Sequence, residues 1–166
     1  NVLKKKYDFD GRQILSTFGL LSSGKSIETT LEALPEIIKG NNKVLFLIIG
    51  KTHPTIYKNE QEQYRNFLEA KIIALNLQHH VQMVNAYLPL PVLLDYLQLT
   101  DIYLFTSKDP NQAVSGTFAY ACSCGCPVIS TPIAHALEVL KNNAGIIVDF
   151  GNSVQISSAV NQLLHD

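Results

Sequence analysis

The sequence lacks the features that mark several classes of protein. Its longest apolar run, Val44 to Ile49, is far shorter than the roughly 18 residues that a membrane-spanning helix needs, and no charged segment precedes an apolar one at the start. The 13 basic and 14 acidic residues give a net charge of −1, and apart from Lys4 to Lys6 the basic residues are scattered. No basic patch predicts binding to nucleic acid or anionic lipid. We therefore expect a domain with no nucleic-acid partner and no direct membrane insertion.

Cysteine is also scarce. Cys122, Cys124 and Cys126 are odd in number and closely spaced, which is not the pattern of a disulfide framework and favours a reducing, cytoplasmic compartment. In a helix that Gly125 and Pro127 interrupt, the three thiols cannot converge on one metal ion. We expect them to be structural residues.

Apolar runs alternate with helical periods along the whole chain. A length of 166 residues is enough for one well-buried core. The pattern predicts an α/β fold: a single Rossmann-like, doubly wound domain over residues 12–166, with a six-stranded parallel sheet and helices on both faces. The expected strands are 13–18, 43–49, 81–84, 101–106, 127–130 and 145–148, and the expected helices are 26–39, 59–76, 91–99, 116–124, 134–141 and 154–164. Residues 1–11, charged and poorly patterned, are interpreted as an incoming connection with a solvated Lys4 to Lys6.

Two loops should form a ligand crevice. In a doubly wound sheet, ligands bind at the carboxyl ends of the strands where the strand order reverses, which we expect between the first and fourth strands. Residues 19–26 follow the first strand and residues 107–115 follow the fourth, and a helix comes after each loop. Free N–H groups and the positive dipole end at both helix starts should then face one crevice, which suits a diphosphate.

The first loop also matches the phosphate-loop pattern G-x-x-x-x-G-K-[ST], from Gly19 to Ser26. A nucleotide hydrolase is therefore an alternative hypothesis. Such an enzyme needs a carboxylate at the end of a neighbouring strand to hold magnesium, whereas the second, third and fourth strands end without an acid. Asp149 does end a strand, but that strand is the sixth, at the far edge. Leu20 and Leu21 are also bulky for a loop that must curl around phosphate.

Several separated motifs resemble one family. The segments 14–25 followed by Glu28, 49–54, 112–120 and 125–132 resemble the C-terminal, donor-binding domain of group 1 (family 4) retaining glycosyltransferases with the GT-B fold. The resemblance implies transfer of a hexose from a nucleotide diphosphate sugar, such as a UDP- or GDP-hexose, without a metal or other cofactor. It also implies a missing N-terminal domain that holds the acceptor, without which this chain would be inactive. Polysaccharide biosynthesis, at the inner membrane face through the missing half, fits the family.

The resemblance assigns roles to residues of the loop at 19–26, of the loop at 107–115 and of the helix that follows the second loop. Gly19 would let the backbone approach the diphosphate, and Lys25 would neutralise the leaving group. Leu20 stands where the family often has arginine, and Gln112 and Tyr120 stand where many relatives have two glutamates. Gln112 with Ser115 would orient the sugar, and the amides that open the helix would contact phosphate or sugar. The donor-binding residues expected in this loop and helix are Gln112, Val114, Ser115, Gly116, Thr117 and Tyr120.

The remaining expected contacts lie in other crevice loops. By resemblance the nucleotide base rests near Asn85 and Tyr87, and near the loop Gly50, Lys51 and Thr52, although a tyrosine packed under a loop is an equal reading of Tyr87. Glu138 matches a family glutamate or is a solvated helix residue. His53 and His135 lie in crevice loops, where His53 could instead cap a turn. A non-catalytic relative that has lost donor use with its glutamates is the second alternative.

Overall fold

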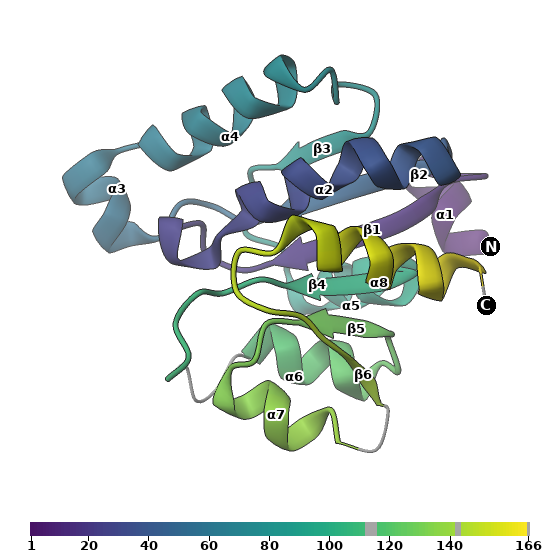
Figure 1. Ribbon diagram of the computed structural model, residues 1–166. Coiled ribbons are helices and arrows are strands. Elements are labelled where there is room, and N and C mark those ends of the chain that lie inside the picture. Colours follow the sequence, from purple (N-terminus) through teal and green to yellow (C-terminus); the bar gives the residue numbers. More distant parts are fainter. Residues whose placement is uncertain (112–115, 142–143, 166) are drawn as a thin grey trace.

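The computed structural model describes residues 1–111, 116–141 and 144–165, and it has a six-stranded sheet (Figure 1). All its strand pairs are parallel and the strand order is β3-β2-β1-β4-β5-β6, so the predicted fold class is confirmed. The order reverses between β1 and β4, as expected. The strands are β1 (Gln13–Phe18), β2 (Val44–Ile49), β3 (Val81–Val84), β4 (Ile102–Phe105), β5 (Val128–Ser130) and β6 (Gly145–Ile147).

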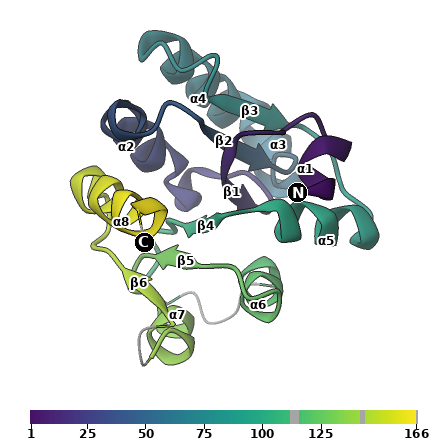
Figure 2. The same ribbon diagram turned by 90° about the vertical axis from the view of Figure 1, so that its right-hand side faces the viewer.

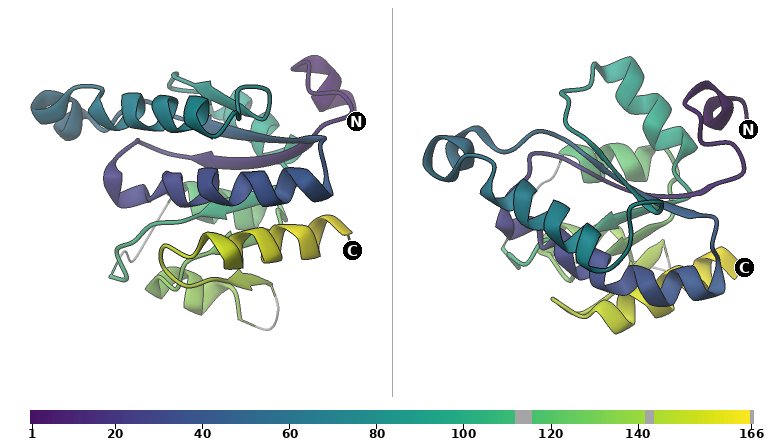
Figure 3. Two further views of the ribbon diagram at one scale, coloured as in Figure 1. Left: turned by 45° about the horizontal axis from the view of Figure 1, so that its top comes forward. Right: turned by 90° about the horizontal axis from the view of Figure 1, so that it is seen from above.

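Helices cover both faces of the sheet because the central strands are apolar on both sides. Every residue of β2 and β4 is buried, as in sheets that are covered on both faces. In β1, Ile14 and Leu15 point into different cores. One core packs under α2 (Ile27–Gly40), α4 (Gln63–Ala74) and α8 (Ser153–His165); the other packs under α1 (Val2–Lys6), α5 (Leu90–Leu99), α6 (Gly116–Ser123) and α7 (Ala134–Val139). Figure 2 shows these two layers on either side of the sheet, and Figure 3 shows α2 and α8 side by side.

The helix expected over 59–76 is two helices. α3 (Pro54–Glu60) begins earlier, where His53 caps it and proline occupies the first turn, and Gln61 then adopts φ 54° before α4 begins. A residue with positive φ cannot continue an α-helix, so the single-helix prediction is wrong at this point. α3 is mostly exposed and lies beyond the carboxyl ends of the strands (Figure 1).

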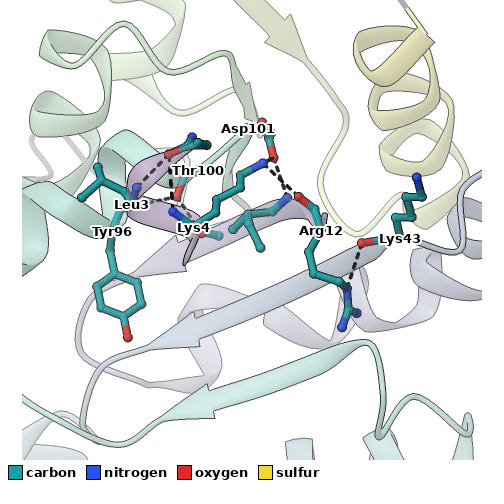
Figure 4. A network of polar contacts seen from close by, with 10 residues as sticks. Leu3, Lys4, Arg12, Lys43, Tyr96, Thr100 and Asp101 are labelled. Carbon is teal, nitrogen blue, oxygen red and sulfur yellow. Dashed lines mark hydrogen bonds and ion pairs between the residues drawn. The ribbon is translucent and has the colours of Figure 1, made fainter. Parts of the chain in front are cut away.

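The first eleven residues pack onto the domain. Asn1 caps α1, and the Lys4 ammonium donates to Asp101 Oδ2 at 2.7 Å and to the Arg12 carbonyl at 2.9 Å (Figure 4). The expectation that Lys4 is solvated is therefore wrong, because a carboxylate at the start of β4 pairs with it in a buried position. Phe9 is also buried and packs against Tyr96 of α5. That this segment leads in from another domain stays a prediction.

Across the described ranges, no helix combines the length and the hydropathy needed to cross a bilayer.

Candidate functional site

The two predicted crevice loops lie against each other. The Lys108 amide, after β4, donates to the Gly24 carbonyl at 3.0 Å, and the Thr106 hydroxyl donates to the Lys25 carbonyl at 2.8 Å. These bonds fix the loop after β1 to the loop after β4 at the point where the strand order reverses. The two loops are thus neighbours, as their places in the sheet predict.

Two glycines allow the ends of β1 and β2 to approach closely. Gly19 has φ 128° and Gly50 has φ 143°, a region that side chains rarely adopt. A Cβ atom on Gly50 would collide with the Gly19 carbonyl oxygen. Both positions therefore require glycine, and both lie on the wall of the crevice.

A pocket of about 240 Å³ opens beside these glycines. It brings together five of the expected donor-binding residues, Gly19, Leu20, Gly50, Lys51 and Tyr87. Phe18, Ile49, Ala86, Leu88 and Leu93 complete its lining. A much smaller cavity beside it, about 10 Å³, is lined by Gly19 and Lys25 among others. Lys25 does not line the pocket itself, but three residues line both the pocket and this small cavity, namely Phe18, Gly19 and Ile49.

Lys25 is a cation held in an unusual environment. It ends the short 3-10 turn Ser23–Lys25, and its ammonium lies 5.4 Å from the centre of the Phe105 ring. None of the ion pairs formed within the described part of the chain includes it. Burial lowers the pKa of Lys25, because desolvation disfavours the charged form. Such a group is suited to receive an anion from solution.

The first loop does not have the conformation of a phosphate loop. The Gly19 and Leu21 amides donate to the carbonyls of Ile49 and Lys51, so the chain continues alongside β2 instead of curling around an anion. The Ser26 hydroxyl, which would hold magnesium, is buried and shares a 2.9 Å hydrogen bond with the Thr29 hydroxyl. These contacts argue against the nucleotide hydrolase.

The start of α2 differs from the expectation. Its first amide, on Ile27, donates to the Tyr64 hydroxyl at 2.9 Å, and that hydroxyl donates to Glu28 Oε2 at 3.1 Å. Burial raises the pKa of Tyr64 well above its usual value, so the hydroxyl keeps its proton. The prediction that free N–H groups at this helix start face the crevice is wrong for Ile27, because a side chain from α4 already satisfies that amide.

Of three further expected residues, two have local partners. The Thr52 side chain is buried and its hydroxyl donates to Glu62 Oε2 at 3.0 Å, while Asn85 is exposed and outside the pocket lining. His53 Nδ1 accepts from the Thr55 amide at 3.2 Å, which is the turn-capping role considered for it. Their places are thus known, whereas their ligand contacts stay predictions.

The residues expected around the sugar are described only in part. Gln112, Val114 and Ser115 fall outside the described residues. Gly116 and Thr117 begin α6, on which Tyr120 is 42% exposed, and Glu138 is exposed on α7. His135, also on α7, has its ring 5.0 Å from that of Phe118, and its Nδ1 is buried with no hydrogen-bond partner among the described residues.

The cysteines are structural where the contacts identify a role. Cys126 is buried, its thiol donates to the Leu97 carbonyl at 3.1 Å, and burial raises its pKa to about 11. A thiol with a raised pKa is a poor nucleophile and metal ligand. Within residues 1–111, 116–141 and 144–165, no three His, Cys, Asp or Glu side chains gather as metal ligands would.

Three polar residues at the start of α4 contribute to the site, and the sequence pattern did not identify them as site residues. The helical period places Tyr64 on an apolar stripe, and it is buried, but the period does not reveal that its hydroxyl forms hydrogen bonds. It assigns no role to Glu62 or to Arg65, which is also buried. The partners of Tyr64 and Arg65 are backbone groups of α2 and of the β2 loop, which no spacing within α4 reveals.

Comparison with known proteins identifies relatives of this arrangement. The family model described as glycosyl transferases group 1 matches residues 2–166. The chain is similar to Anabaena HepE, solved in complex with UDP, with a TM-score of 0.85 and 19% identity over 99% of this chain and 42% of that one. It is also similar to the C-terminal domain of LpcC from Francisella tularensis, with a TM-score of 0.84 and 18% identity over 99% of this chain and 82% of that one. WaaG, described as involved in lipopolysaccharide biosynthesis, has a TM-score of 0.76 and 19% identity over 99% and 41%. Among curated proteins, no sequence matches.

Proposed function

The chain belongs to the group 1 glycosyltransferases, and we propose that it is the domain that binds the nucleotide-sugar donor of a retaining hexosyltransferase. The observation that carries the proposal is the position of Lys25. Burial desolvates its ammonium, which takes no part in the ion pairs of the described residues. Lys25 also shares a small cavity with Gly19, which lines the pocket together with Gly50 and Tyr87. HepE, whose fold this chain shares, has been solved with UDP and with UDP-glucose.

The size of the pocket suggests which part of the donor it would hold. Pockets for whole drug-sized ligands are usually about 300–1,000 Å³, and this one is about 240 Å³. It would hold the nucleoside, with the Tyr87 ring available to cover the base. The diphosphate would then extend past Gly19 to Lys25, whose charge would stabilise the departing nucleoside diphosphate.

The rest of the enzyme is part of the same proposal. Gln112 and Ser115 would orient the sugar, and the acceptor would come from a second, N-terminal domain, so this chain alone would transfer nothing. The chain spans 42% of HepE and 41% of WaaG. We propose a cytoplasmic role in polysaccharide biosynthesis, without metal or cofactor, with contact to the inner membrane face through the second domain.

Calorimetric titration of the chain with UDP, GDP and ATP, each with EDTA and with magnesium, tests the proposal. We expect a nucleoside diphosphate to bind equally well under both conditions, and the corresponding monophosphate to bind more weakly. Binding of ATP only with magnesium would instead support the phosphate-loop hydrolase. No binding of any nucleotide would support the alternative that the chain is a non-catalytic relative.

A further inference from the structure

The carbonyl of Gly50 lies where the β2–β3 ladder stops. The Gly50 amide donates to the Val84 carbonyl at 3.0 Å, which is the last contact of that ladder. The Ala86 amide then turns back to the same Val84 carbonyl at 3.0 Å. If the parallel ladder continued, the Ala86 amide would donate to the Gly50 carbonyl instead. The Gly50 carbonyl therefore needs a donor from outside the sheet.

Arg65 of α4 supplies that donor. Its Nη2 donates to the Gly50 carbonyl oxygen at 2.7 Å, and its Nε donates to Glu62 Oε2 at 2.8 Å. The same Glu62 oxygen accepts from the Thr52 hydroxyl at 3.0 Å. One guanidinium–carboxylate pair at the start of α4 thus holds the residues on both sides of Lys51.

Stability alone gives a poor account of this arrangement. Arg65 is 5% exposed, and its Nη1 is buried with no hydrogen-bond partner among the described residues. A buried donor without an acceptor destabilises the folded state, and buried ion pairs can often be replaced by apolar side chains without loss. What the pair does provide is a fixed position for Gly50 and Thr52.

Resting on the proposed function, we propose that Arg65 and Glu62 are positioning residues that set the nucleoside wall of the donor pocket. Neither lines the pocket; they act through the Gly50 carbonyl and the Thr52 hydroxyl. Gly50, Lys51 and Tyr87 all line the pocket, whereas Lys25 belongs to the separate turn after β1. The pair therefore controls affinity for the nucleoside and not for the diphosphate.

The test compares UDP with inorganic diphosphate on the wild type, Arg65→Met and Arg65→Lys. We expect both variants to lose about tenfold in affinity for UDP, and to bind inorganic diphosphate as the wild type does. Lysine keeps the charge but cannot reach two acceptors as a guanidinium fork does, so it does not rescue a positioning role. Rescue of UDP affinity by lysine, or equal loss of both ligands, would overturn the inference in favour of simple attraction by charge.

Two further variants keep the result interpretable. Lys71→Met on the same helix removes an ion pair with Glu32 and should leave both affinities unchanged. Thr52→Val removes only the hydroxyl contact and should weaken UDP selectively, which decides the matter if Arg65→Met does not fold. Folded Arg65→Met and Thr52→Val variants that bind UDP like the wild type would overturn this inference alone. A wild type that binds neither UDP nor diphosphate would overturn the proposed function, and this inference with it.

Discussion

Replacing Lys25 by methionine removes one positive charge from the crevice and keeps most of the apolar length of the side chain. The ammonium lies 5.4 Å from the centre of the Phe105 ring and takes no part in the ion pairs of the described residues. Loss of a cation–π contact costs about 0.5–1 kcal/mol, and relief of the desolvation of a buried charge acts in the opposite direction. We expect the free energy of unfolding to change by less than about 1 kcal/mol.

The effect on donor binding should be much larger. A hydrogen bond to a charged group contributes about 1.5–3 kcal/mol, which corresponds to roughly 10- to 150-fold in affinity. Lys25→Met should lose UDP affinity by that factor while its urea unfolding midpoint stays close to that of the wild type. Lys39→Met, which removes an exposed lysine paired with Glu36 at the far end of α2, is the matched control and should change neither quantity.

The pH dependence follows from the direction of the shift. Because burial lowers the pKa of Lys25 below its ordinary value of 10.5, UDP affinity should fall as pH rises through that lowered pKa. In the same window the unfolded chain binds more protons, so the unfolding free energy of the wild type relative to Lys25→Met should rise with pH. Wild-type UDP affinity in Lys25→Met, or parallel pH profiles of the two proteins, would refute the reasoning.

Three other substitutions have expected outcomes. Gly50→Ala places a Cβ against the Gly19 carbonyl at a φ that alanine rarely adopts, so the melting temperature and the UDP affinity should fall together. A variant with the melting temperature and the UDP affinity of the wild type in calorimetry would contradict this close approach. Asp101→Asn weakens the bond with Lys4 and should cost about 1–3 kcal/mol in urea unfolding, without effect on donor affinity, since the pair lies at the amino end of the strands. Tyr87→Ala should reduce affinity for UDP by about tenfold and leave inorganic diphosphate binding intact, because stacking on a base contributes about 1–3 kcal/mol; equal losses of both ligands would exclude a base contact.

Hydrophobic periodicity was sufficient to predict the strands of the sheet. β1 and β3 have the predicted bounds, and the other strands differ by at most one residue at an end. Strands such as β2 are buried on both faces, so burial alone dictates their apolar runs. Helix bounds were less predictable where the backbone angles of a single residue decide them, as at Gln61, whose positive φ separates α3 from α4.

The crevice was predictable from topology, whereas its internal contacts were not. The loops after β1 and β4 must be neighbours once the strand order is known. The close approach of Gly19 and Gly50, in contrast, is seen only in the structure. The partner of Ile27 is Tyr64, and that of Gly50 is Arg65, each distant in sequence. Likewise Lys4 reads as one of three solvated lysines until Asp101 is placed beside it. Such pairs depend on tertiary packing, which periodicity within one element does not encode.

The most direct test of the account is where a nucleoside diphosphate binds on the chain. Amide chemical-shift mapping with UDP in EDTA should give its largest changes at Gly19, Lys25, Gly50 and Tyr87. A different, larger pocket of about 800 Å³, lined by Cys122, Gly145 and others, lies at the amino ends of β5 and β6 and should stay silent. Shifts confined to that pocket, with none around Gly19 and Lys25, would contradict the account.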